Sequence, residues 1–147
     1  MEKKITFDIG IKKIKDLAFS VNEEITPEKE SGIQINSGLH FDKTENTIEF
    51  SLDIRFTQKQ GGVEFMSSKT STIFFVPDLA KYENPDAPNS FNPPDAMIIT
   101  IVSLSLTHAR ALIARNADGT KFKDIYLPIF NPTDITNNLF SKQLKKK

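Results

Sequence analysis

Hydrophobic and polar residues alternate along most of the first half of the chain. The clearest stretch has apolar side chains at consecutive even positions, with polar residues between them: Ile48, Phe50, Leu52, Ile54 and Phe56. A period of two is typical of a strand with one buried face. The pattern therefore predicts a strand over residues 48–56 whose even-numbered side chains enter the core.

Residues 5–21 alternate in the same way, starting from Ile5 and Phe7. The phase shifts at Ile14 and returns to odd positions from Leu17, which indicates a β-bulge near Lys12-Lys13 or a bend near Lys15-Asp16. The charged segment that follows predicts a solvated connection rather than a further strand.

Two more strands complete the predicted sheet. Residues 33–41 form one, interrupted at Asn36-Ser37-Gly38, and residues 63–76 form the other after a hairpin turn at Gly61-Gly62. Because residues 67–72 all carry polar side chains, we expect the middle of this last strand to face water or a neighbouring subunit.

The second half of the chain changes to helical spacing. A proline-rich crossover over residues 78–95 excludes regular structure, Asp95 is a good N-cap for a long apolar helix, and Gly119 is a good left-handed stop. Asn131-Pro132 then predicts the start of a terminal helix. The long helix is apolar around most of its circumference, so it needs two burial partners, such as a sheet and a second subunit.

Composition narrows the class of protein. A chain of 147 residues is most naturally one domain, residues 1–147, and its 19 basic and 19 acidic residues leave no net field to attract nucleic acid or an anionic membrane. The chain has no cysteine and no signal-like N-terminus, which fits a cytoplasmic protein. Polar residues interrupt the apolar helix, so we expect it to be buried against protein rather than inserted in a membrane.

No pattern of catalytic residues stands out. His40 and His108 do not form a metal-binding spacing, and there is no Gly-x-Ser-x-Gly elbow or phosphate-binding loop. We therefore expect no enzyme activity, no metal and no cofactor. Twelve phenylalanines offer a large apolar area instead, and an RNA-stacking sheet is the weaker interpretation of such aromatics.

The order of the predicted elements resembles the SecB family of export chaperones. The likeness rests on Ala109-Arg110 in the long helix, a Gly119-Thr120 break, Leu127-Pro128 before Asn131, and a last helix that reaches Leu139-Phe140. The N-terminal run from Lys15 to Phe19 also resembles the first strand of that family.

The resemblance implies an α+β fold in which two C-terminal helices pack on one face of a four-stranded antiparallel sheet. It also implies a homo-oligomer, a dimer or a dimer of dimers, that holds non-native polypeptides without ATP and serves protein export. Docking to the family's translocation motor, SecA, uses an acidic surface on the sheet. Here Asp16 matches one such carboxylate, whereas Ser20 and Ser68 stand where others are expected, and the C-terminal tail is rich in lysine. The handover partner is therefore expected to differ.

Candidate client contacts come from the crossover and from the last quarter of the chain: Tyr82, Phe91, Leu127, Ile129, Phe130, Leu139 and Phe140. Packing in the core or between subunits is the competing interpretation of each of them. It is weakest for Tyr82 and Phe91, because these aromatics lie in a polar loop.

A second class of function remains open at this point. Relatives of the SecB family act as chaperones for antitoxins, so the chain is also compatible with a dedicated adaptor that has one protein partner. A role in binding a small molecule is the third possibility.

Overall fold

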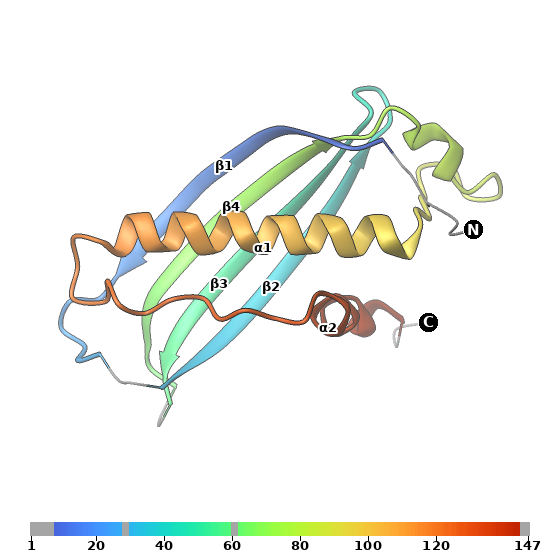
Figure 1. Ribbon diagram of the computed structural model, residues 1–147. Helices are drawn as coiled ribbons and strands as arrows, with labels where there is room; N and C mark the ends of the chain where they lie inside the picture. Colours follow the sequence, from blue (N-terminus) through green and yellow to red (C-terminus); the bar gives the residue numbers. More distant parts are fainter. Residues whose placement is uncertain (1–7, 28–29, 60–61, 145–147) are drawn as a thin grey trace, which may run out of the picture.

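The computed structural model describes residues 8–27, 30–59 and 62–144. Along the chain the elements are β1 (Gly10–Val21), β2 (Ser31–Asp42), β3 (Thr47–Gln58), β4 (Glu64–Phe75), the 3-10 helix η1 (Leu79–Tyr82), α1 (Asp95–Ala117) and α2 (Pro132–Leu144) (Figure 1). The predictions made for Ile5, Phe7 and Gly61 lie outside the described residues.

The four strands form one antiparallel sheet in the order β1-β4-β3-β2. The register of β1 shifts between Ile11 and Lys13, which confirms the predicted bulge, and again between Asp16 and Ala18, just beyond the predicted bend. β2 pairs with β3 along its whole length without a break. The predicted interruption at residues 36–38 is therefore wrong. Small polar residues are compatible with a strand here, because Ile35 and Leu39 flank Ser37 on the side of β2 that faces the helices.

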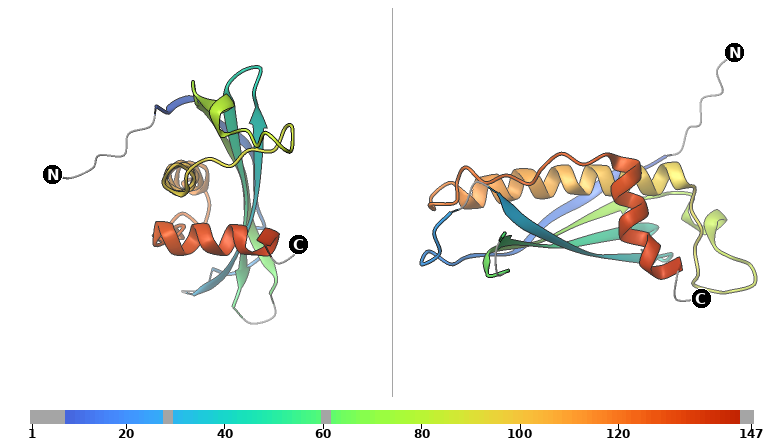
Figure 2. Two further views of the ribbon diagram at one scale, coloured as in Figure 1. Left: turned by 90° about the vertical axis from the view of Figure 1, so that its right-hand side faces the viewer. Right: turned by 90° about the horizontal axis from the view of Figure 1, so that it is seen from below.

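The two helices lie on the same side of the sheet (Figure 2). α1 crosses the strands and packs mainly on β1, β3 and β4, whereas α2 follows on the β2 side. The predicted buried face of β3 is confirmed, since each of its five apolar side chains is at most 2% exposed: Ile48, Phe50, Leu52, Ile54 and Phe56. The fold is therefore α+β, with a four-stranded antiparallel sheet and two C-terminal helices.

Half of the polar middle of β4 is buried beneath α1, which corrects in part the prediction that it faces water or another subunit, since Lys69 on the other face is exposed. Ser68, Thr70 and Thr72 are at most 4% exposed. In the register of the sheet they lie beside Ile54, Leu52 and Phe50, so they share the face that α1 covers. The prediction was based on residue type alone. Because side chains alternate between the two faces of a strand, every second residue of this polar stretch lies under the helix.

α1 meets this hydroxyl row with polar side chains of its own. His108 Nδ1 and Thr72 Oγ1 form a hydrogen bond of 3.0 Å, while Ser105 is 2% exposed. Ser105 on the helix and the Ser and Thr side chains of the row are short, which lets α1 lie close to β4 at these positions.

Acidification is expected to weaken this contact. Burial lowers the pKa of His108 below its ordinary value of 6.5, so the folded chain favours the neutral imidazole. The associated stability is complete above pH 6.5 and is lost as the pH falls below that value, because the unfolded chain then binds the proton more readily. His108→Gln should therefore reduce the drop in Tm between about pH 7.5 and pH 5.5.

Thermal unfolding followed by circular dichroism over this range measures the effect. His40→Gln is the matched control, since His40 is exposed on β2, and it should keep the pH dependence of the unchanged chain. An unaltered dependence in His108→Gln would contradict the prediction.

The ends of α1 differ slightly from expectation. The helix already includes Asp95, and Pro94 occupies the capping position without a side-chain hydrogen bond. At the other end Gly119 does not have a positive φ, so the predicted left-handed stop is wrong. Thr120 takes its place, because both its backbone N–H and its Oγ1 donate to the carbonyl of Ala117 at 2.9 Å.

By length and composition alone, α1 could cross a membrane, with a mean hydropathy of 1.7. In the structure it lies against the sheet, and Met97, Ile101 and Ile113 are fully buried in the core.

α2 begins as predicted, because the Asn131 side chain accepts a hydrogen bond from the backbone N–H of Asp134 at 3.0 Å.

Candidate client-binding surface

Apolar side chains are left half-buried along the β2 side of the molecule. They come from the helix side of β2, from the crossover and from α2, and we call them the apolar strip: Ile33, Ile35, Leu39, Phe41, Phe91, Leu139 and Phe140. The cause is geometric. A single long helix that packs mainly on β1, β3 and β4 leaves the edge strand β2 less covered than the two central strands.

Aromatic contacts connect the members of the apolar strip. Phe91 of the crossover stacks on Phe41 at the end of β2, with ring centroids 4.9 Å apart. The ring centroid of Phe140 in α2 lies 6.3 Å from that of Phe50 in β3. Segments that are far apart in the sequence therefore meet at one edge of the sheet.

The crossover contains a 3-10 helix and a β-bridge, which corrects the prediction that its prolines exclude regular structure. After η1, Glu83 forms an isolated β-bridge with Phe91. The Glu83 carboxylate also accepts hydrogen bonds from the backbone N–H of Asn89 at 3.0 Å and from Lys43 Nζ at 3.2 Å. These two donors, the backbone N–H first, lower the pKa of Glu83. The loop that carries Phe91 is thus tied both to itself and to the β2–β3 turn.

The segment between the helices runs extended along α1 (Figure 1). Arg110 holds it there, because its Nε donates to the carbonyl of Leu127 at 2.9 Å and its Nη2 to that of Pro128 at 2.8 Å. Leu127 is 1% exposed, whereas Ile129 is 90% exposed. Residues two apart in a regular extended strand point to the same side, so the opposite exposures of Leu127 and Ile129 show that the stretch around Pro128 is not a regular strand.

The predicted client contacts therefore occupy different places. Phe91, Leu139 and Phe140 belong to the apolar strip, and Ile129 lies exposed just before α2. The other three lie outside the strip: Tyr82 and Phe130 are half-buried against the core, and Leu127 is inside it.

Sequence reasoning did not select the β2 members of the strip, Ile33 to Phe41, as contacts. Their alternation was visible in the sequence. What it could not show is that β2 would be an edge strand lying beyond the main cover of α1. Strand order was the missing information.

Asp16, the predicted docking carboxylate, lies on β1. Its Oδ2 accepts a hydrogen bond from Asn116 Nδ2 at 2.8 Å, near the end of α1. It is exposed, and its role in docking stays a prediction.

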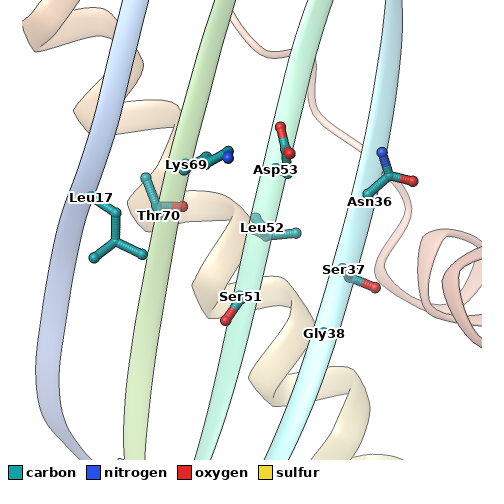
Figure 3. A pocket seen from close by; sticks show the side chains of 9 residues that line it. All are labelled: Leu17, Asn36, Ser37, Gly38, Ser51, Leu52, Asp53, Lys69 and Thr70. Atoms are coloured by element: carbon teal, nitrogen blue, oxygen red, sulfur yellow. The ribbon is translucent and has the colours of Figure 1, made fainter.

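The opposite side of the sheet, which we call the open face, is polar. A shallow hollow of about 310 Å³ lies on it, with Leu17, Asn36, Asp53 and Lys69 among its lining residues (Figure 3). Gly38 contributes to the hollow because it has no side chain, and a Cβ added there would meet no atom within 4 Å.

Charges on the open face neutralise one another in pairs. Lys15 Nζ lies 3.1 Å from a carboxylate oxygen of Glu49. Ser71 donates a hydrogen bond to the same carboxylate, and this bond, ahead of Lys15, lowers the pKa of Glu49. Arg55 lies between Asp53 and Glu64, at 3.3 Å and 3.0 Å. Within the described ranges, no group of three or more His, Cys, Asp or Glu side chains could hold a metal ion.

Comparison with known proteins gives a structural match and no match by sequence. No protein-family model and no curated protein matches the chain. The chain is similar in structure to the Mycobacterium tuberculosis Rv1957 SecB-like chaperone, solved in complex with a ChAD peptide from the Rv1956 HigA1 antitoxin. The match has a TM-score of 0.57 at 11% identity, and it covers 83% of this chain and 90% of the other. The chain therefore has a SecB-like fold with a strongly diverged sequence.

Proposed function

We propose that the chain is an ATP-independent chaperone, a holdase that binds apolar segments of non-native proteins at the apolar strip and at Ile129. The observation that carries the proposal is the position of these side chains. They are half-buried or exposed along one side of a SecB-like fold, where Phe91, Phe140 and the β2 residues lie together.

Physical chemistry supports a broad specificity. Burial of apolar surface contributes about 25 cal/mol per Å² and has no preferred direction, so a strip of Ile, Leu and Phe accepts many sequences. The proposal includes no enzyme activity and no cofactor, and it places the protein in the cytoplasm, among unfolded or partly folded proteins.

Ile129→Asn tests the surface with little risk to the fold. Ile129 is 90% exposed, so its removal leaves the core intact, whereas a client that buries it loses about 1.5–3 kcal/mol of apolar contact. We expect binding of an unfolded client to weaken by at least about tenfold and by up to about a hundredfold, since about 1.4 kcal/mol corresponds to a factor of ten. Suppression of the aggregation of a denatured protein and fluorescence anisotropy with a labelled unfolded client measure the loss.

Leu17→Asn is the matched control. Leu17 is 57% exposed but lies on the open face, so this variant should bind clients as well as the unchanged chain. Equal losses in both variants would remove Ile129 from the proposed binding surface. No suppression of aggregation by the unchanged chain would refute the holdase function itself.

A dedicated antitoxin chaperone is the second candidate function. It is favoured by one observation, that the similar Rv1957 structure contains a peptide from an antitoxin. Competition separates the two candidates, because unrelated unfolded proteins displace the client of a general holdase but not the partner of a dedicated adaptor.

Assembly into a homo-oligomer, a dimer or a dimer of dimers, also belongs to the proposal. The side of α1 away from the core carries short side chains, such as Thr100, Ser103 and Thr107, none of them fully buried. Helices approach one another closely where such residues meet. Light scattering gives the solution mass, and a stable monomer at working concentration would argue against assembly.

Export remains the third part of the proposal. If a translocation motor receives the client, Asp16 is the candidate contact on this chain. Loss of motor binding in Asp16→Asn, with client binding unchanged, is the result expected, and unimpaired motor binding would exclude this role.

A further inference from the structure

The two edge strands of the sheet are built differently. β1 has two breaks in register and carries Lys12, Lys13 and Lys15. Bulges and lysines are the features by which proteins keep an edge strand from pairing with another chain. β2 has neither: its register with β3 is unbroken from Ser31 to Asp42, and it contains no lysine and no proline.

β2 also has unused main-chain groups. In the described part of the chain, β2 is paired with β3 alone. Every second residue of an edge strand directs its N–H and C=O groups outward. A regular edge of this length therefore offers a row of donors and acceptors that only another extended backbone can satisfy as a set.

The side chains of β2 also restrict which segments can pair with this strand. On the helix side, Ile33, Ile35, Leu39 and Phe41 are half-buried. On the open face the alternate residues are polar and exposed, as at Asn36. A strand placed next to β2 would have every second side chain beside the apolar strip and the others beside polar groups.

We propose that β2 accepts an extended segment of a non-native protein as a fifth strand of the sheet, and that it prefers segments in which apolar and polar residues alternate. This inference rests on the proposed function and specifies its client class. It assigns part of the affinity to main-chain hydrogen bonds, which do not depend on sequence, and the selection of clients to the alternating pattern.

An isolated segment fits this edge better than a second copy of the chain. α2 lies next to β2 at this side of the sheet (Figures 1 and 2), and it packs mainly against α1. A second subunit paired through its own β2 would bring another α2 and another crossover loop to the same place. A single strand needs only the usual spacing of about 4.8 Å from its neighbour.

Backbone methylation of a peptide tests the inference directly. The probe is a synthetic peptide of about ten residues, the length of an ordinary strand, with alternating leucine and threonine and lysines at both ends. Two variants carry N-methyl groups on alternate amides, one on each parity. A fifth strand directs one set of amides to β2 and the other to solvent, so one variant should bind at least about tenfold more weakly than the parent and the other should bind like it.

Amide hydrogen exchange of the chaperone provides the second readout. Peptide binding should slow the exchange of alternate β2 amides and leave β1, the matched edge, unchanged. Equal binding of both methylated peptides, or no alternating protection in β2, would overturn the inference while binding of unfolded proteins still upheld the proposed function. If neither peptides nor unfolded proteins bind, the proposed function fails first and the inference fails with it.

Discussion

Replacing Phe122 with alanine should lower the free energy of unfolding by about 3–5 kcal/mol. Phe122 is fully buried, and its ring stacks on that of Phe65, with centroids 4.9 Å apart. Phe65 in turn lies 6.3 Å from Phe56 of β3. The ring therefore attaches the segment that follows α1 to β4, and its loss leaves a cavity that this rigid sheet can fill only in part.

Tyr126→Ala provides the comparison. Tyr126 belongs to the same segment but is 58% exposed, so its removal should change the free energy of unfolding by about 0.5 kcal/mol or less. Denaturant titration measures both variants. A cost below about 1 kcal/mol for Phe122→Ala would show that the segment is not anchored by this ring.

Arg110→Ala should detach the segment between the helices and lower stability by about 1.5–3 kcal/mol, the usual contribution of hydrogen bonds to a charged group. The guanidinium bonds to two successive carbonyls, those of Leu127 and Pro128. Without it, both carbonyls return to water and Ile129 loses its fixed position. We therefore expect faster proteolysis of residues 125–131 and weaker client binding, together with the lower stability.

Arg115→Ala is the control for this variant, since Arg115 is exposed on the same helix. Limited proteolysis with mass spectrometry, combined with denaturant titration, distinguishes the two substitutions. Protease resistance equal to that of the unchanged chain in Arg110→Ala would mean that the buried Leu127 alone holds the segment.

Much of the fold followed from alternation in the sequence. The even-numbered apolar residues of β3, from Ile48 to Phe56, correctly predicted both the strand and its buried face. β4 was harder, because Ser68, Thr70 and Thr72 are polar and yet share that face. A hydrophobic pattern indicates whether a side chain favours the core or water. In β4 the polar side chains are buried because the strand lies between β1 and β3 and beneath α1. The distinction depends on strand order, which local patterns do not contain.

The site shows the same division. Phe91 was predicted as a client contact because it is an aromatic residue in a polar loop, and its stacking on Phe41 is a tertiary contact that no spacing in the sequence predicts. Leu127 and Ile129 were equivalent in the sequence. They differ because the segment held by Arg110 is not a regular strand, so residues two apart do not share a side: Leu127 enters the core and Ile129 lies in solvent.

The clamp at Glu83 has a consequence for how partners are captured. Because its carboxylate already closes the crossover on Asn89 and Lys43, the loop beneath Phe91 does not have to become ordered when a protein arrives. The entropic penalty of association then falls mainly on the incoming chain. Under the proposed function, partners are then distinguished by timing: a chain that is still unstructured can bind, whereas one that has completed folding has no extended segment to offer.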